Sequence, residues 1–129
     1  MEEKTPLKIL LIDDDRFLLD MYLLKFKKSG LDTDTSAASL DALQKLRDGK
    51  IYDILLVDII MPGMDGLEFL KTIRDEKLLP EAVVIMLTNQ GSDLEKAKSM
   101  NVDGYIIKAT TIPSEVVEQV LAIYKQRKR

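Results

Sequence analysis

The 129-residue sequence contains no cysteine and no histidine. Thiolates and imidazoles are the common zinc ligands of proteins, thiols carry redox chemistry, and imidazole is the commonest general base. Their absence closes the usual routes to zinc binding, disulfide formation and imidazole catalysis. Any chemistry must therefore use carboxylates, hydroxyls, amines and hard cations.

The sequence also lacks long apolar runs and an excess of positive charge. No apolar run approaches 18 residues and no signal peptide opens the chain, which predicts a cytoplasmic protein without a membrane partner. The 19 basic and 22 acidic residues give a net charge of -3, which argues against nucleic acid as a partner. Only the tail "KQRKR" is locally basic, and a solvated helix end favoured by the helix dipole is its better interpretation.

Hydrophobic residues make up 46% of the chain, enough for one core without disulfides or structural zinc. Short apolar runs alternate with segments of helical period, a pattern typical of a parallel sheet covered by helices. Gly30 and Gly49 are expected to end the first two helices. We expect a loose N-terminus over residues 1–6, a single domain over 7–129, and strands at residues 8–12, 33–38, 53–57, 82–87 and 104–108. Helical spacing is seen in three sets: Leu19, Tyr22, Leu23 and Phe26; Leu67, Leu70 and Ile73; and Val117, Val120, Leu121 and Tyr124.

Polar residues follow four of these strands at the point where each strand ends. The carboxyl ends of parallel strands share one edge of the sheet, where ligands of open α/β folds bind. The expected strands therefore bring together, in chain order, Asp13, Asp14, Asp15, Asp58, Thr88 and Lys108.

Each of these residues also has a purely structural interpretation. Asp15 is suited to cap the first helix, and Asp58 to open the turn before Pro62. Thr88 is compatible with an ordinary strand position, and Lys108 with an exposed charge. Their joint placement at one edge is what favours a site.

A hard cation and a phosphoryl group fit this set of side chains. Mg²⁺ prefers oxygen ligands and keeps several waters, so one or two carboxylates suffice to hold it. A neighbouring carboxylate can attack phosphorus and form an aspartyl phosphate. A hydroxyl and an ammonium group would then stabilise the transferring phosphoryl oxygens.

Four segments, "LLIDDD", "ILLVDIIMPGMDG", "VIMLT" and "DGYIIK", together resemble the receiver domain of two-component response regulators over roughly residues 7–127. The resemblance implies an α/β fold, a (βα)5 flavodoxin-like (CheY-like) three-layer sandwich whose five-stranded parallel sheet has the order 2-1-3-4-5. It also implies a phosphoryl group received from a sensor histidine kinase or a histidine phosphotransfer protein.

By this resemblance, Asp58 is the expected phosphoacceptor and Asp13 and Asp14 are the expected metal-holding pair. Asp58 and the backbone carbonyl of Ile60 would complete the protein ligands of Mg²⁺. Lys108 matches the phosphate-binding lysine. Such a phosphoprotein would catalyse only its own Mg²⁺-dependent phosphorylation and dephosphorylation.

The resemblance further assigns Thr88 as the switch hydroxyl and Tyr105 as an aromatic that turns inward on activation. A half-exposed aromatic on an edge strand is the equally weighted structural interpretation of Tyr105. The expected output is a downstream protein partner, or self-association, through helix four, strand five and helix five. The chain would be a stand-alone receiver or a receiver excised from a longer protein.

The sequence departs from the family pattern at three places. Ala109 follows Lys108 where proline is usual, and we expect a trans peptide there because a cis bond before a non-proline residue costs about 2.5–4 kcal/mol. Asn89 stands where a small residue is usual, and Ile60 offers no polar side chain to orient water. We expect Ile60, Asn89 and Gln90 to modulate the rate of phosphate loss, and a long-lived phosphoprotein.

Three other functions fit the sequence less well. In a haloacid-dehalogenase-type phosphohydrolase, Asp13 would be the nucleophile and Asp15 the general acid, but Arg16 and Phe17 lack that family's following hydroxyl or valine. In a flavodoxin-type carrier of flavin or nucleotide, three carboxylates at the mouth of strand one would repel a phosphate, and no Gly-rich cradle appears. A degenerate receiver used only as an interaction surface would not need the complete site.

Overall fold

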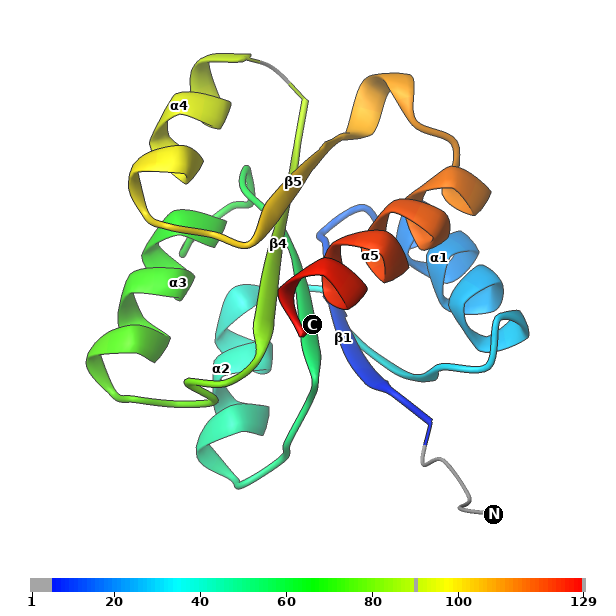
Figure 1. Ribbon diagram of the computed structural model, residues 1–129. Coiled ribbons are helices and arrows are strands. Elements are labelled where there is room, and N and C mark those ends of the chain that lie inside the picture. Colours follow the sequence, from blue (N-terminus) through cyan, green and yellow to red (C-terminus); the bar gives the residue numbers. More distant parts are fainter. Residues whose placement is uncertain (1–5, 90, 129) are drawn as a thin grey trace.

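The computed structural model describes residues 6–89 and 91–128, with side chains described outside 91–94. Strands and helices alternate along the chain (Figure 1). None of the described helices combines the length and the apolar character that crossing a membrane requires. The predicted loose N-terminus falls almost wholly outside the described residues. The elements are β1 Lys8–Ile12, α1 Arg16–Lys28, β2 Asp32–Ser36, α2 Ser39–Arg47, β3 Ile54–Asp58, α3 Gly66–Asp75, β4 Val83–Thr88, α4 Gly91–Ser99, β5 Gly104–Ile107, the 3₁₀ turn η1 Lys108–Thr110 and α5 Pro113–Arg127.

The five strands form one parallel sheet in the order β2-β1-β3-β4-β5, as predicted. Its register aligns the strand ends that carry the candidate site. Ile12 lies opposite Val57, so Asp13 and Asp58 are the next residues on two neighbouring strands. Asp58 in turn lies opposite Leu87, one residue before Thr88.

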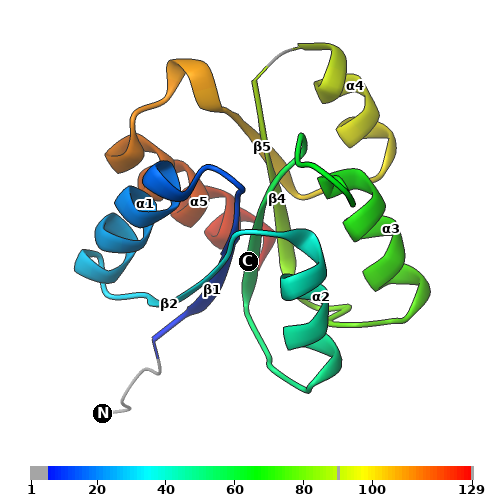
Figure 2. The ribbon, with the colours of Figure 1, turned by 180° about the vertical axis from the view of Figure 1, so that it is seen from behind.

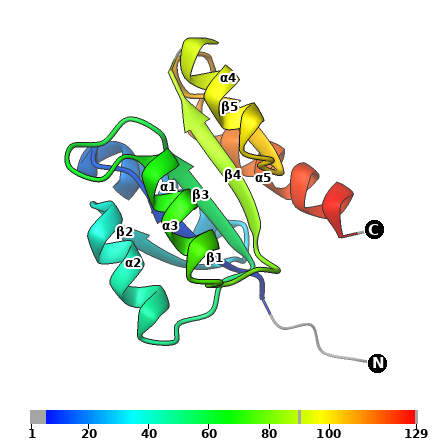
Figure 3. The same ribbon diagram turned by 90° about the vertical axis from the view of Figure 1, so that its left-hand side faces the viewer.

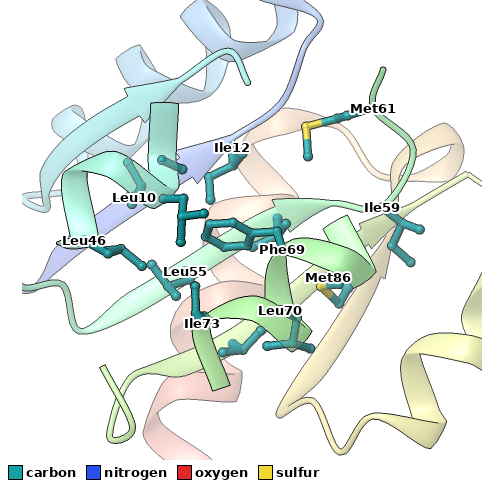
Figure 4. Packing of buried hydrophobic residues seen from close by; sticks show 14 of the residues in the cluster. Leu10, Ile12, Leu46, Leu55, Ile59, Met61, Phe69, Leu70, Ile73 and Met86 are labelled. Carbon is teal, nitrogen blue, oxygen red and sulfur yellow. The ribbon is translucent and has the colours of Figure 1, made fainter. Parts of the chain in front are cut away.

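Helices cover both faces of the sheet and complete a three-layer sandwich (Figures 2 and 3). Side chains of the strands alternate between the two faces. Leu10 and Ile12 pack with residues of α2 and α3, including Phe69, in the cluster that Figure 4 shows. Ile9 and Leu11 pack on the opposite face with residues of α1 and α5. Burial on both faces explains why the central strands are continuously apolar.

The strand ends differ from the predicted ones by one or two residues, because pairing with a neighbour decides where a strand stops. β2 ends at Ser36, opposite Ile12, so the prediction that it would extend through Ala38 was wrong. β5 ends at Ile107, opposite Thr88, and Lys108 opens the turn η1 instead of closing the strand as predicted.

Two glycines end helices as predicted. Gly30 and Gly49 have φ values of +90° and +96° directly after the C-caps of α1 and α2. This left-handed backbone is readily adopted only by glycine.

A third glycine, Gly66, brings α3 against the end of β3. Its N–H donates a 2.8 Å hydrogen bond to the carbonyl of Ile59. A Cβ atom at Gly66 would lie 2.3 Å from the carbonyl oxygen of Asp58. Asp65 caps α3 and forms a capping box with Glu68. The start of α3 is therefore fixed beside the candidate phosphoacceptor.

The chain returns to the amino edge of the sheet, the edge where the strands begin. β1 starts there, and α5 runs back to end near the start of β4 (Figure 3). The ammonium of Lys128 donates a 3.0 Å hydrogen bond to the carbonyl of Glu81. Both ends of the folded part thus lie opposite the carboxyl edge.

Candidate functional site

The carboxyl edge of the sheet gathers the predicted polar side chains into one site. Carboxylate oxygens of Asp13, Asp14 and Asp58 lie within 4.8 Å of one another. Asp13 is 0% exposed, Asp58 3% and Thr88 0%, whereas Asp14 is exposed to solvent. Lys108 joins Asp13 and Asp58 from η1, and Thr88 ends β4 at the same edge of the sheet.

Lys108 is shared between the two buried carboxylates. Its Nζ lies 2.9 Å from Asp13 Oδ2 and 3.1 Å from Asp58 Oδ2, and it donates a hydrogen bond to Asp58. One ammonium therefore faces two buried carboxylates.

The trans peptide expected before Ala109 is confirmed, since the described residues contain no cis peptide bond.

Asp13 is held firmly, and one of its carboxylate oxygens faces Lys108. Its N–H donates to the carbonyl of Ser36 at 3.2 Å, and its Oδ1 accepts a 3.0 Å hydrogen bond from the N–H of Asp15. Its buried Oδ2 is ion-paired with the Lys108 ammonium at 2.9 Å and has no further hydrogen-bond partner within the described structure. A buried carboxylate oxygen whose one partner is an ammonium group is compatible with a cation as a further partner.

The negative charge of the clustered aspartates is only partly neutralised by Lys108. Burial and then the negative charge of Asp13 raise the pKa of Asp58 to about 7, although Lys108 acts in the opposite direction. Burial disfavours the charged form of Lys108, but Asp13 and Asp58 together raise its pKa above the ordinary value. Lys108 is therefore charged, and the aspartate cluster still carries excess negative charge.

Three clustered carboxylates, two of them buried, fit a hard divalent cation such as Mg²⁺. Mg²⁺ favours oxygen ligands and is held by few protein groups with waters completing its shell. The exposed position of Asp14 suits a ligand that shares the ion with water. The residues present thus fit the predicted metal.

Asp15, the third carboxylate of the run, has the structural role that the sequence allowed. It is the N-cap of α1, and its side chain accepts a 3.1 Å hydrogen bond from the N–H of Leu18. Its carboxylate is engaged with the helix end, which disfavours the general-acid role required by the phosphohydrolase interpretation.

Three of the predicted modulating and switch residues, Ile60, Asn89 and Tyr105, are exposed to solvent. Ile60 is 55% exposed, and Asn89 is exposed beyond the end of β4. Gln90 lies outside the described residues. Tyr105 is 39% exposed on the edge strand β5, and the Lys98 ammonium lies 5.6 Å from the centroid of its ring.

Sequence reasoning missed two contributors to this site. The carbonyl of Ser36 fixes the backbone of Asp13, and nothing local in the sequence points to it. Gly66 fixes the loop after Asp58, and the spacing of Asp65 and Glu68 around it is a capping-box signal that could have placed the start of α3.

Comparisons with known proteins agree with the geometry. The family model described as response regulator receiver domain matches residues 9–120. The transcriptional regulatory protein ResD of Bacillus subtilis is 34% identical over 98% of this chain and 51% of its own length. The heme response regulator HssR of Staphylococcus epidermidis is 38% identical over 88% of this chain and 48% of its own length.

Among solved structures, the receiver domain of the Francisella response regulator 1452 is 27% identical and has a TM-score of 0.80, covering 95% of this chain and 99% of that one. The chain spans about half the length of the curated relatives just described. The matched segment contains every site residue placed above. The chain therefore belongs to the response regulator receiver domain family of two-component systems.

Proposed function

We propose that Asp58 accepts a phosphoryl group from a phosphohistidine of a sensor kinase or histidine phosphotransfer protein. The observation that carries this proposal is the buried Asp58 carboxylate at the carboxyl edge, hydrogen-bonded to Lys108 and within 4.8 Å of the Asp13 and Asp14 carboxylates. In the transfer, a carboxylate oxygen of Asp58 forms the new P–O bond. The P–N bond of the donor breaks, and its electron pair stays with the imidazole.

Asp13, Asp14 and Asp58, with the carbonyl of Ile60, would hold the Mg²⁺ ion. When bound, the ion would neutralise charge on the phosphoryl oxygens and on the clustered carboxylates. It would also favour the ionised form of Asp58, whose raised pKa otherwise keeps part of it protonated near neutral pH.

Lys108 and Thr88 would bind the phosphoryl group after transfer. The Lys108 ammonium already contacts Asp58 Oδ2, so the new phosphoryl oxygens would form within its reach. Thr88 closes β4 beside the strand that carries Asp58, and its hydroxyl is the proposed switch contact. Phosphorylation would thereby draw the ends of β4 and β5 toward Asp58.

The proposed output is a change in the surface formed by α4, β5 and α5, with Tyr105 at its centre. This surface would bind a downstream protein or a second copy of the chain, in a cytoplasmic protein without nucleic-acid or membrane contacts of its own. The same description applies to a stand-alone receiver and to one within a longer protein.

The experiment is intact-mass measurement after incubation with acetyl phosphate, with and without a chelator. The wild type should gain the mass of one phosphoryl group only when Mg²⁺ is present. Asp58→Asn should gain none, whereas the control Asp20→Asn, an exposed change on α1, should behave as wild type. Labelling that persists in Asp58→Asn and maps to Asp13 would replace this proposal with the phosphohydrolase.

A further inference from the structure

A concave site lies at the amino edge of the sheet, opposite Asp58. It has a volume of about 450 Å³ and is formed by the end of α3, the α3–β4 loop, the start of β4 and the end of α5. In Figure 1 the end of α3 and the α3–β4 loop lie toward the bottom of the view, whereas the strands run upward to their carboxyl ends. The volume falls in the range of small-molecule sites in proteins.

The floor of this cavity is apolar. Leu70 and Ile73 of α3 and Val84 of β4 line it and are themselves buried. Leu78 and Pro80 of the α3–β4 loop extend the apolar lining toward solvent. A ligand would therefore meet a small apolar area at the base of a cavity whose accessible lining is mostly polar.

The rim is cationic although the whole chain has a net charge of -3. Four basic side chains line the cavity, against two acidic ones, Glu81 and Asp103. Arg127 is neutralised by Asp103, since its Nε lies 2.6 Å from the Asp103 Oδ1. The basic residues of the lining are Arg74, Lys77, Arg127 and Lys128.

The other three cations form no ion pair with a carboxylate within the described part of the chain. Arg74 donates hydrogen bonds to the carbonyls of Met100 and Asn101, the second at 2.9 Å. Lys128 donates to the carbonyl of Glu81 at 3.0 Å. Carbonyl dipoles orient these groups but leave their charge in place.

The lining loop is fixed before any ligand binds. Its backbone is closed by hydrogen bonds from Leu78 N–H to the Ile73 carbonyl at 2.8 Å and from Ala82 N–H to the Leu79 carbonyl at 3.1 Å. Leu79 keeps a left-handed backbone with φ of 46°, a conformation that bulky residues rarely adopt. The cavity is thus preorganised, which lowers the entropic penalty of binding.

From this combination we infer that the cavity binds a small amphipathic anion, with an apolar body on the Leu70–Ile73 floor and a carboxylate or phosphate group beside Lys77 and Lys128. The modest volume suits a small molecule rather than a protein face. The site is independent of the phosphoryl chemistry proposed for Asp58.

The test uses naphthalene-2-carboxylate as probe, followed by amide chemical shifts of the full chain in solution. We expect saturable binding with a dissociation constant below about 1 mM and shifts concentrated in the cavity lining. The neutral analogue naphthalene-2-carboxamide should bind about tenfold more weakly, because it lacks the charge that the rim would attract.

Matched variants separate this cavity from general attraction to a basic surface. Lys77→Gln combined with Lys128→Gln should weaken binding of the carboxylate about tenfold while leaving the thermal unfolding midpoint within a few degrees of wild type. Lys27→Gln, an exposed change on α1, should leave binding unaltered. The inference is overturned by equal affinity for the carboxamide, by shifts mapping elsewhere, by an equal loss in Lys27→Gln, or by no saturable binding.

Discussion

Asp58 combines two properties that oppose each other. It has to be ionised to act as a nucleophile, and it is buried beside a second buried carboxylate, Asp13. Burial and the Asp13 charge raise its pKa to about 7, and Lys108 compensates only in part. The site therefore stores unfavourable electrostatic energy that a bound cation or a phosphoryl group with its metal would relieve.

We predict that Asp58→Asn stabilises the metal-free domain at neutral pH. The folded-state pKa lies above the unfolded value of 3.8, so the folded state binds more protons between pH 3.8 and about 7. Stability therefore falls as the pH rises through this window, and the asparagine variant avoids that loss. Urea unfolding in chelator should show a gain on the order of 1–3 kcal/mol above pH 7 and almost none near pH 4.

Added Mg²⁺ should reduce the difference in unfolding free energy between the wild type and Asp58→Asn, because the ion binds the folded wild type more tightly than the folded variant. Asp20→Asn is the control for loss of one exposed carboxylate and should change stability little. A wild type that is more stable than Asp58→Asn in chelator at neutral pH would contradict the stored electrostatic energy.

A second prediction concerns the lifetime of the phosphorylated domain. Hydrolysis needs a water held opposite the carboxylate that leaves. The isoleucine at position 60 cannot orient such a water through its side chain, and we expect the asparagine at 89 to restrict its approach. Ile60→Asn and Asn89→Ala should each speed phosphate loss roughly tenfold, the equivalent of about 1.4 kcal/mol. The measurement is the rate at which the phosphorylated domain loses phosphate in Mg²⁺ after the phosphodonor has been removed.

The control is Leu40→Asn, which makes the same kind of apolar-to-amide change at an exposed position on α2. If Ile60→Asn and Asn89→Ala lose phosphate no faster than this control, water access at these positions does not set the lifetime.

At the scale of helices and strands, the contact of α3 with β3 positions the loop after Asp58. We predict that Gly66→Ala destabilises the domain by about 1–3 kcal/mol, because its Cβ would collide with the Asp58 carbonyl and displace the helix start. Phosphorylation by acetyl phosphate should slow in parallel. Chemical unfolding and the labelling rate report the two effects.

Gly63→Asn is the matched glycine control. Gly63 has φ of +77°, and a Cβ atom at this position would meet no atom within 4 Å. Asparagine tolerates such a backbone better than most residues. Equal losses in the two variants would show that backbone conformation, rather than close approach to Asp58, is limiting.

The edge strand β2 depends on a side-chain hydrogen bond for its position. The buried Tyr52 hydroxyl donates a 2.6 Å bond to Asp34 Oδ2 on β2. Burial opposes ionisation of Asp34, but Tyr52 and Lys45 outweigh it and lower its pKa. We predict that Tyr52→Phe costs about 1–2 kcal/mol of unfolding free energy. In an Asp34→Asn background the same change should cost less, and equal costs would rule out this coupling.

The sheet was predictable because its central strands are continuously apolar and their polar ends mark where each stops. The strand ends were less predictable, since Ser36 and Ile107 are last residues only because their partners end there. For the same reason Lys108 reaches the site from a turn that no propensity indicated. The gathering of the carboxylates followed from parallel topology, whereas the role of Gly66 depends on a contact made only after folding.

Across the whole molecule, the helices differ in how many apolar side chains they bury against the sheet. Among its described side chains α4 buries only Ala97, whereas α3 buries Phe69, Leu70 and Ile73. Few buried apolar contacts mean a low free energy of local opening. We predict that amides near the end of α4 exchange with solvent faster than those of α3 in native-state hydrogen exchange, and equal protection would contradict this.

The return of α5 to the amino edge has a practical consequence for building sensors from this domain. A fluorescent protein or a surface tether joined to either end of the folded part would project from the side where β1 begins. This side is opposite the carboxyl edge that carries Asp58. Donor proteins would keep free access to the phosphoacceptor in such a fusion. The same attachment would crowd the basic cavity beside Lys128, so a reporter for anion binding requires an internal insertion instead.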